Sequence, residues 1–508
     1  MNSNKLIEQS SNEVLRLLEL INEKDTEDLS SEATKQRWGG IYYDKESNES
    51  IGKTVAKIQN EAFRLFGSTN ALYPTVWPSI ANMQTDLIKL CISFCKGQHD
   101  AQKGILAKGI LASGGTESIL LALLAHREWA YSKNIKTPEI IAASTCHGAC
   151  HKACFYFGMK LILVKPDEIT QRISRHEVEP LITKNTIMIY SSAPTFPHGV
   201  VDDIKSLSEL AKEYDIGLHI DNCLGGILLQ YTRNLNLLSH DGYAIDAANG
   251  FENLGVTSIS IDLHKYGFSS KGVSAVIFRN NQLRQFVFHP VAPVKGGKAT
   301  GGGYITPTLQ GSRSGGPIAA SWATMKFMLK HYNNTLKHIH EAYITMKDGV
   351  HSIVGVETIG ASEICIVGFR SSMPNIITNR QINKEMRKKG WALFSGENPS
   401  ALGICVGEQH IHTCNKFCTD LNNVMLDLIE KAKTLSHNNN NIATSTSNSK
   451  SSGSEDGGVY QAAPANATET IMKSSLIRFI ESGLDQNSNQ STNKLTSLID
   501  DFRQSSKL

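Results

Sequence analysis

The stretch SISIDLHKYGFSSKG, residues 258–272, decides the fold and the chemistry expected of this chain. Its first residues are rich in isoleucine, which predicts a buried strand, and the strand passes directly into His264 and Lys265. Lysine is rarely buried without a partner, and burial lowers its pKa so that the free amine can act as a nucleophile. A lysine whose amine reaches the surface is the alternative, but the residues on both sides of Lys265 read as interior.

Similar short apolar runs recur along the chain and alternate with helical patterns. This alternation predicts βαβ units and a mostly parallel sheet. Ligands of such sheets bind at the carboxyl ends of the strands. The predicted strands are GILASGG (109–115), EIIAAS (139–144), KLILVK (160–165), IMIYSSA (187–193), IGLHIDN (216–222), SISIDL (258–263) and VSAVIF (273–278).

Small and hydroxyl-bearing residues follow the first of these strands. They are Ser113, Gly114, Gly115 and Thr116, and they open a helical pattern. Free backbone N–H groups at a helix N-terminus bind phosphate. The alternative is a simple helix cap, because serine and threonine are good N-cap residues.

Two further strand ends carry titratable side chains. Asp221 directly follows an apolar run, where a carboxylate is costly unless it is paired, although a helix N-cap would also explain it. His147 follows the strand predicted at 139–144.

Histidine and cysteine gather around His147 and again near residue 410, but neither group has the spacing of a known metal site. The first lacks both C-x-x-C and H-E-x-x-H, and we predict no metal there or at the second group. The residues concerned are Cys146, His147, Cys150, His151 and Cys154, and then the segment HIHTC (410–414) with Cys418.

One cofactor uses all four strand ends at once. Pyridoxal 5'-phosphate needs a lysine for its Schiff base, an acid against its pyridine nitrogen, a phosphate cradle and a flat group over its ring. The pattern therefore predicts this cofactor, with Lys265 as its covalent anchor.

Composition excludes several classes of function. The chain has 508 residues, Lys+Arg 51 against Asp+Glu 48, and no basic stripe, so nucleic-acid binding is not indicated. No run approaches the roughly 18 to 20 apolar residues of a membrane span. The N-terminus lacks an apolar signal core, and the ten cysteines are too sparse for a disulfide scaffold. We expect a soluble cytoplasmic protein, with contact between its N-terminal arm and a membrane surface left open.

Three segments are predicted along the chain. Residues 1–70 form a polar N-terminal arm, residues 71–335 the large cofactor-binding domain, and residues 336–508 a small α+β C-terminal domain. Within the last, strands are predicted at 363–370 and 401–407 and helices at 379–394 and 467–485. Residues 436–458 are of low complexity and too polar to pack, which predicts a disordered insertion.

Several of these motifs together resemble the sphingosine-1-phosphate lyase family, within the group II pyridoxal phosphate decarboxylases. The resemblance covers roughly residues 35–435 and resumes at GGVYQAAP (457–464). It implies the aspartate aminotransferase-like fold of pyridoxal phosphate enzymes, fold type I. The stretches that carry it are SGGTESILLA (113–122), TPEIIAASTCHGACHKACFYFGMK (137–160), PTFPHGVVDDI (194–204), LHIDNCLGG (218–226), VTSISIDLHKYGFSSKG (256–272) and GYITPTLQGSRSGGPIAASWA (303–323).

The resemblance implies roles for matching residues. Lys265 would bind the cofactor covalently, Asp221 would hold its pyridine nitrogen and His147 would stack on its ring. The residues 113–116 and His264 would bind its phosphate. Ser312 matches a loop that the family donates across a dimer interface, which implies a homodimer with shared active sites. Residues that resemble the family's substrate-phosphate pocket are Lys271, Tyr42, Asn70 and Tyr73.

Two segments depart from the family pattern. Tyr73 stands where the family usually has histidine, and tyrosine can donate a hydrogen bond to phosphate but brings no positive charge. Residues 289–308 are longer and richer in glycine than the corresponding family segment, which we expect to reshape the substrate entrance.

The implied reaction is a retro-aldol cleavage of phosphorylated sphingoid bases to a long-chain aldehyde and phosphoethanolamine. The base that removes the hydroxyl proton stays open between the released Lys265 amine, a tyrosine and the substrate phosphate. An amino-acid decarboxylase on the same scaffold is the first alternative, and a catalytically silent lipid-binding relative is the second.

Overall fold

The computed structural model describes residues 14–16, 51–291, 304–397 and 399–439. Much of the predicted N-terminal arm, the segment 292–303 and the predicted helix at 467–485 lie outside these ranges. Within them, no helix is both long enough and apolar enough to cross a membrane.

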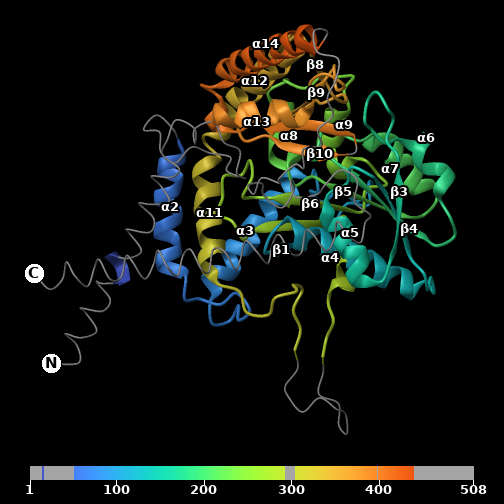
Figure 1. Cartoon of the computed structure of the whole chain (residues 1–508). Helices are drawn as coiled ribbons and strands as arrows, with labels where there is room; N and C mark the ends of the chain where they lie inside the picture. The colour runs from blue at the N-terminus through green and yellow to red at the C-terminus, as the bar shows by residue number, and fades with distance from the viewer. Residues whose placement is uncertain (1–13, 17–50, 292–303, 398, 440–508) are drawn as a thin grey trace, which may run out of the picture.

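A seven-stranded sheet forms the centre of the larger part of the molecule (Figure 1). Its strand order is β1-β7-β6-β5-β4-β2-β3, and β7 alone runs antiparallel to its neighbours, so the sheet is mixed but mostly parallel. All seven runs predicted from the sequence are confirmed as its strands, and the predicted α/β fold class is confirmed with them. The strands are β1 (Lys108–Ala112), β2 (Glu139–Ala143), β3 (Lys160–Val164), β4 (Thr186–Ser192), β5 (Gly217–Asp221), β6 (Ser258–Asp262) and β7 (Ser274–Phe278).

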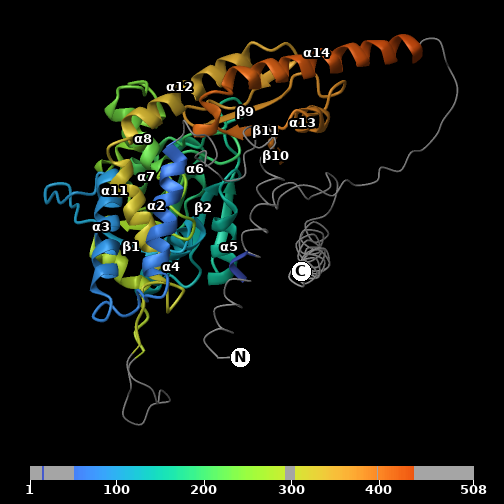
Figure 2. The same cartoon turned by 90° about the vertical axis from the view of Figure 1, so that its left-hand side faces the viewer.

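Helices cover both faces of this sheet. Because successive strand residues point to opposite faces, Ile140 and Met188 pack with α4 and α5, whereas Ile141 and Ile189 pack with α3, α7 and α8. Helix α2 lies side by side with α11 in both views (Figures 1 and 2). The helices of this part are α2 (Ile51–Phe66), α3 (Pro78–Phe94), α4 (Gly115–Ser132), α5 (Gly148–Phe157), α6 (Arg175–Val178), α7 (Ile204–Glu213), α8 (Gly225–Asn234), α9 (Tyr243–Ala248), α10 (Asn281–Arg284) and α11 (Gly315–Met328), with 3-10 turns η1 (Glu179–Leu181), η2 (Gly250–Glu252) and η3 (Gln285–Val287).

A smaller antiparallel sheet with the order β10-β11-β9-β8 follows in the chain, and α12 and α14 lie above it in Figure 1. The two sheets fall on either side of residue 335, and the predicted domain boundaries themselves stay a prediction. The elements are α12 (Tyr332–His351), β8 (Val356–Thr358), β9 (Ile366–Ser371), α13 (Asn379–Lys388), β10 (Phe394–Glu397), β11 (Ser400–Cys405), η4 (Glu408–His410) and α14 (Cys414–Asn439).

Two predicted boundaries in this part are wrong. The helix expected at 379–394 ends at Lys388, because Gly390 adopts φ +90°, and Phe394 begins strand β10. Helix α14 continues to Asn439, so residues 436–439 of the predicted disordered insertion are helical. Extending an existing helix adds one backbone hydrogen bond for each residue that is fixed. Residues 440–458 lie outside the described ranges.

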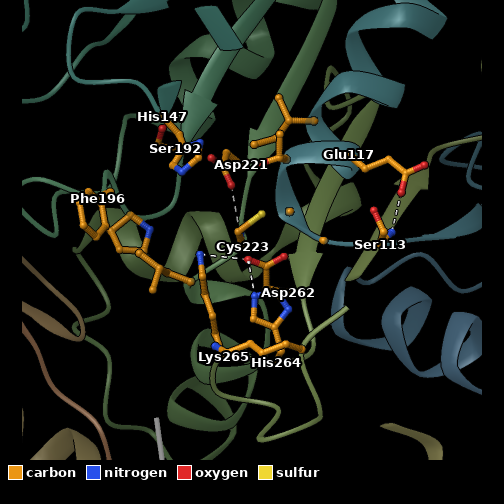
Figure 3. Close-up of a pocket in the computed structure, with 17 residues that line it drawn as sticks. Ser113, Glu117, His147, Ser192, Phe196, Asp221, Cys223, Asp262, His264 and Lys265 are labelled. Carbon is orange, nitrogen blue, oxygen red and sulfur yellow. Dashed lines mark hydrogen bonds and ion pairs between the residues drawn. The ribbon is translucent and has the colours of Figure 1, made fainter. Parts of the chain in front are cut away.

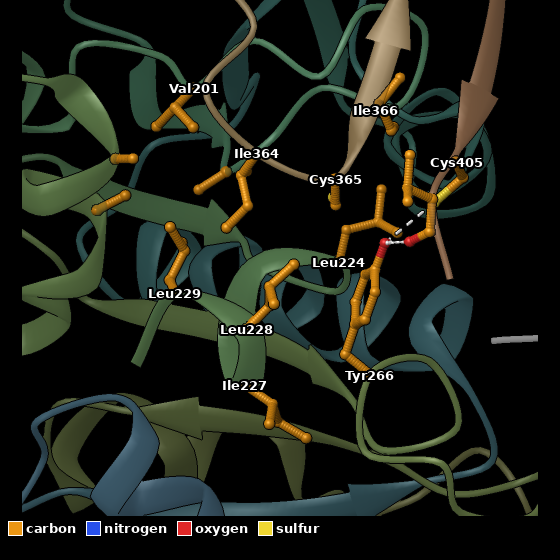
Figure 4. Packing of buried hydrophobic residues seen from close by; sticks show 14 of the residues in the cluster. Val201, Leu224, Ile227, Leu228, Leu229, Tyr266, Ile364, Cys365, Ile366 and Cys405 are labelled. Carbon is orange, nitrogen blue, oxygen red and sulfur yellow. Dashed lines mark hydrogen bonds between the residues drawn. The ribbon is translucent and has the colours of Figure 1, made fainter. Parts of the chain in front are cut away.

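The loop after β6 is anchored to the small sheet (Figure 4). The buried Tyr266 hydroxyl donates to the Val406 carbonyl at 2.7 Å, just beyond β11. Leu224, Cys365 and Cys405 belong to the same buried cluster. The residue that follows Lys265 is therefore fixed against the small sheet, which restricts the backbone on which Lys265 is carried.

Candidate active site

The four chemically unusual strand ends meet in one cavity of about 450 Å³ (Figure 3). This volume lies within the range of small-molecule sites. Of the residues predicted for the site, those that line it are Ser113, Gly114, Gly115, Thr116, His147, Asp221, His264, Lys265 and Lys271. They come from segments up to 158 residues apart in the sequence, because the carboxyl ends of parallel strands share one edge of the sheet.

Lys265 forms an ion pair inside the cavity. Its Nζ lies 3.0 Å from Oδ2 of Asp262, and the side chains of Lys265 and Asp262 are 19% and 4% exposed. Asp262 also accepts a hydrogen bond from Ser274 Oγ at 2.5 Å and lies 3.7 Å from Nε2 of His264. Lysine needs such a partner to be stable in the interior.

The charges around Asp262 decide its ionisation. Burial raises the pKa of this carboxyl, but the charges of Lys265 and His264 and the hydrogen bonds from Ser274 and Lys265 outweigh burial, so its pKa is lowered. Asp262 is therefore ionised at neutral pH. The sequence reasoning missed this residue, although its place three positions before Lys265, at the end of the same buried strand, was a usable signal.

Asp221 ends β5 and is nearly buried. Its Oδ2 accepts the Tyr190 hydroxyl at 2.6 Å, and its Oδ1 accepts the backbone N–H of Cys223 at 3.1 Å. It does not cap a helix, because α8 has Leu224 as its N-cap and no side-chain cap. A carboxylate held in this way at the cavity wall can pair with a cationic nitrogen of a ligand.

His147 is both a helix cap and a cavity residue. Its Nδ1 accepts the backbone N–H of Ala149 at 3.1 Å at the start of α5. The pKa of His147 is lowered, mainly because the ring is buried. The negative charges of Asp221 and Asp262 oppose this shift, and the positive charge of Lys265 adds to it. The imidazole is thus neutral at pH 7, with its proton on Nε2 because Nδ1 accepts a hydrogen bond.

Helix α4 begins at the cavity without a side-chain cap. Its N-cap is Gly114, and no atom lies within 4 Å of the position that a Cβ on Gly114 would take. The simple-cap alternative for residues 113–116 is therefore not what the structure shows. Gly114, Gly115 and Thr116 line the cavity, and the backbone N–H groups of a helix's first turn have no partner within the helix, as an anion site requires.

Glu117 is a second residue that the sequence reasoning missed. Its carboxylate accepts the N–H of Ser113 at 2.6 Å and the N–H of Leu309 at 2.8 Å. The Ser113 N–H is therefore already engaged within the protein, and the loop that follows residue 304 is tied to the start of α4. An acidic residue in the first turn of a helix was the available signal.

Three of the predicted phosphate-pocket and loop residues lie together outside this cavity. Asn70 Nδ2 donates to Ser312 Oγ at 3.0 Å, and the Tyr73 side chain is 53% exposed. None of the three is among the residues that line the cavity. Tyr42 lies outside the described residues.

The residues present fit the cofactor expected from the sequence. An amine, a buried carboxylate, a flat neutral ring and an uncapped helix start open on one cavity, and these are the groups that pyridoxal phosphate requires. His264 also lines the cavity, and its pKa is lowered by burial although Asp262 opposes this. In the described ranges, no three His, Cys, Asp or Glu side chains are placed to share a metal ion.

Comparison with known proteins gives consistent matches. Residues 67–372 match the family model described as the pyridoxal-dependent decarboxylase conserved domain. The chain is 36% identical over 370 residues to sphingosine-1-phosphate lyase of Dictyostelium discoideum, covering 73% of this chain and 66% of the relative. It is 38% identical over 364 residues to the enzyme of the same name from Oryza sativa, covering 71% and 64%. The matched region thus spans just under two thirds of these curated relatives.

Solved structures show the same likeness. The structure of sphingosine-1-phosphate lyase from Burkholderia pseudomallei superposes with a TM-score of 0.71 at 29% identity, covering 87% of this chain and 94% of that one. A glutamate decarboxylase of Lactobacillus brevis superposes with a TM-score of 0.65 at 17% identity, covering 80% of this chain and 92% of that one. At this identity the likeness shows a common fold and nothing more.

Proposed function

Since the chain belongs to the pyridoxal-dependent decarboxylase family, we propose that it is a carbon–carbon lyase that cleaves phosphorylated sphingoid bases to a long-chain aldehyde and phosphoethanolamine. Its cofactor is pyridoxal 5'-phosphate. The observation that carries the proposal is the likeness to the Burkholderia pseudomallei lyase over 94% of that chain at 29% identity. Three amino-acid decarboxylases with the same fold are 17%, 14% and 14% identical to this chain.

The cavity residues divide the work of binding the cofactor. Lys265 supplies the amine for covalent attachment, Asp221 pairs with the ring nitrogen, and the neutral His147 ring covers the cofactor ring. The first turn of α4 binds the phosphate with its backbone N–H groups, and His264 lies close by. When bound, pyridoxal phosphate supplies an electron sink for the electrons of the broken carbon–carbon bond.

Asp262 controls the proton on Lys265. At 3.0 Å, the ionised carboxylate stabilises the ammonium form of Nζ whenever that nitrogen is not attached to another group. Lys265 is then suited to donate a proton to the carbon left by the departing aldehyde. It is less suited to remove the hydroxyl proton of the substrate, which favours another group as that base.

The substrate phosphate requires a cation at the cavity. Lys271 lines the cavity and supports this role. Asn70, Tyr73 and Ser312 are grouped outside the cavity of their own protomer, which supports a homodimer in which they complete the partner's site. We place Tyr42 in the same pocket on the resemblance alone, and we retain the cytoplasm as the proposed location.

The reaction is tested by product analysis. The holoenzyme is incubated separately with sphingosine 1-phosphate and with a panel of amino acids, and products are identified by mass spectrometry. Aldehyde and phosphoethanolamine are expected with the first, and neither is expected with Lys265→Ala. Release of CO₂ without aldehyde would establish a decarboxylase instead. Cofactor binding without turnover of any compound would support the silent relative.

The shared site is tested by mixing inactive variants. Lys265→Ala and Tyr73→Ala are each expected to be inactive, and co-refolded protomers should recover about a quarter of the parent activity. Half of the dimers would be mixed, and each would hold one intact site. No recovery, with mixed dimers verified by native mass spectrometry, would show that Tyr73 serves its own protomer.

A further inference from the structure

Tyr190 lies directly behind Asp221 in the sheet. It belongs to β4, which pairs in parallel with β5, and it is fully buried. Its hydroxyl donates to Asp221 Oδ2 at 2.6 Å, while the Cys223 N–H occupies Oδ1 at 3.1 Å. Each carboxylate oxygen therefore has its own donor, and the carboxylate cannot rotate without losing a hydrogen bond.

The buried imidazole of His219 packs against the ring of Tyr190. The two ring centroids lie 5.4 Å apart, and Tyr190 and His219 are register partners. His219 Nδ1 bonds Ser258 Oγ at 2.8 Å and Nε2 bonds Ser260 Oγ at 3.1 Å. Both ring nitrogens are thus satisfied inside the sheet, which fixes the ring that orients Tyr190.

We propose that Tyr190 is a positioning residue: its hydrogen bond to Oδ2 holds the Asp221 carboxylate in the orientation in which it keeps the cofactor's ring nitrogen protonated. The inference rests on the cofactor in the proposed function and not on the substrate. A protonated ring nitrogen is what makes the cofactor an electron sink. A carboxylate stabilises a protonated nitrogen only when one of its oxygens faces that nitrogen at hydrogen-bond distance.

The protonation of Tyr190 is secure. Burial raises its pKa well above the ordinary value, and the Asp221 charge raises it further, so the hydroxyl keeps its proton as a donor. His219 stays neutral, because burial lowers its pKa to about 3 even though Asp221 opposes the shift.

Other titratable groups act on Asp221 from the surrounding elements, and their contributions are common to the parent and to a variant at position 190. They are His147 and Cys146 at the start of α5, His219 on β5, and Cys223 after β5.

A purely structural role for the Tyr190 hydroxyl would affect stability and not the ring proton, so the test reads the proton directly. The holoenzyme is loaded with cofactor labelled with ¹⁵N in the ring, and the ¹⁵N chemical shift is followed with pH. In Tyr190→Phe, the carboxylate can turn away from the ring nitrogen and stabilises its proton less. The pH at which the ring nitrogen loses its proton should therefore fall by about one unit, a tenfold change for one charge-assisted hydrogen bond.

A matched control is Tyr343→Phe. Tyr343 is also fully buried, and its hydroxyl bonds Ser362 Oγ at 3.0 Å in the small lobe. This variant loses a buried hydrogen bond of the same kind and should leave the ring titration unchanged. Site-specific 4-aminophenylalanine at position 190 keeps the shape but is a weaker donor that holds the carboxylate less firmly. It should lower the titration by a smaller amount than Tyr190→Phe, which keeps the test decisive if Tyr190→Phe does not fold.

Equal titration curves for the parent and the position-190 variants would overturn the inference. Failure of the parent to bind the cofactor would instead refute the cofactor assignment. Loss of lyase activity with an intact ring titration would leave the inference standing and refute only the proposed substrate, so the outcomes are distinct.

Discussion

Replacing Lys265 by methionine in the cofactor-free protein should expose the cost of the buried Asp262 charge. The substitution keeps the length of the side chain and removes the ammonium 3.0 Å from Asp262 Oδ2. Breaking a buried ion pair from one side costs about 3–5 kcal/mol. Because Lys265 is 19% exposed and His264 Nε2 lies 3.7 Å from the same carboxylate oxygen, we expect the free energy of unfolding to fall by about 2–4 kcal/mol at pH 8.

The pH dependence has a definite sign. In the parent, the lowered pKa of Asp262 contributes stability above the unfolded pKa that is lost as pH falls through the folded pKa. In Lys265→Met, burial is no longer opposed by the ammonium, so the Asp262 pKa rises above its ordinary value. Protonation of Asp262 or of His264 then removes the unpaired buried charge. The loss in unfolding free energy of the variant relative to the parent should therefore be smaller at pH 5 than at pH 8.

Urea unfolding at the two pH values measures the effect. Lys271→Met is the matched control, because it removes an exposed lysine from the same cavity, and it should cost less than about 1 kcal/mol. Lys265→Met combined with Asp262→Asn should recover most of the loss, since the unpaired charge is gone. A deficit that is equal at both pH values, or a double variant no more stable than Lys265→Met, would refute the reasoning.

Three further substitutions test other contacts. Gly115→Ala should destabilise the protein by about 1–3 kcal/mol in urea unfolding, because its Cβ would lie 2.7 Å from an Asp262 oxygen, whereas Gly114→Ala has open space and should cost less than about 1 kcal/mol. Burial raises the pKa of Asp202 to about 7, so its ionisation opposes folding as pH rises through that value. The unfolding free energy of Asp202→Asn should therefore increase relative to that of the parent between pH 5 and pH 8. A difference that stays the same would contradict the raised pKa of Asp202. Tyr266→Phe should lower the unfolding free energy by about 1–2 kcal/mol, measured in the same way, and no loss would mean that the link to the small sheet is not stabilising.

The residue pattern along the chain was enough to predict the large sheet and the meeting of its strand ends. Runs such as residues 187–190 are apolar enough to be buried on both faces, and parallel strands bring their carboxyl ends to one edge. Lys265, Asp221 and His147 could therefore be expected to lie close together before any coordinates were known. Local patterns also predicted the helix that opens after residues 113–116, but not the end of α13, where a glycine conformation decided the boundary.

The groups that hydrogen-bond to these side chains could be identified only from the packed structure. The hydrogen bond of Tyr190 to Asp221 depends on the register of β4 against β5, and the bond of Glu117 to Leu309 joins residues 192 positions apart. Asn70 and Ser312 meet across a comparable separation, outside the cavity of their own protomer. A residue type and its local pattern fix whether a strand or helix forms, whereas a side-chain partner depends on distances between distant segments, and those are set only when the elements pack.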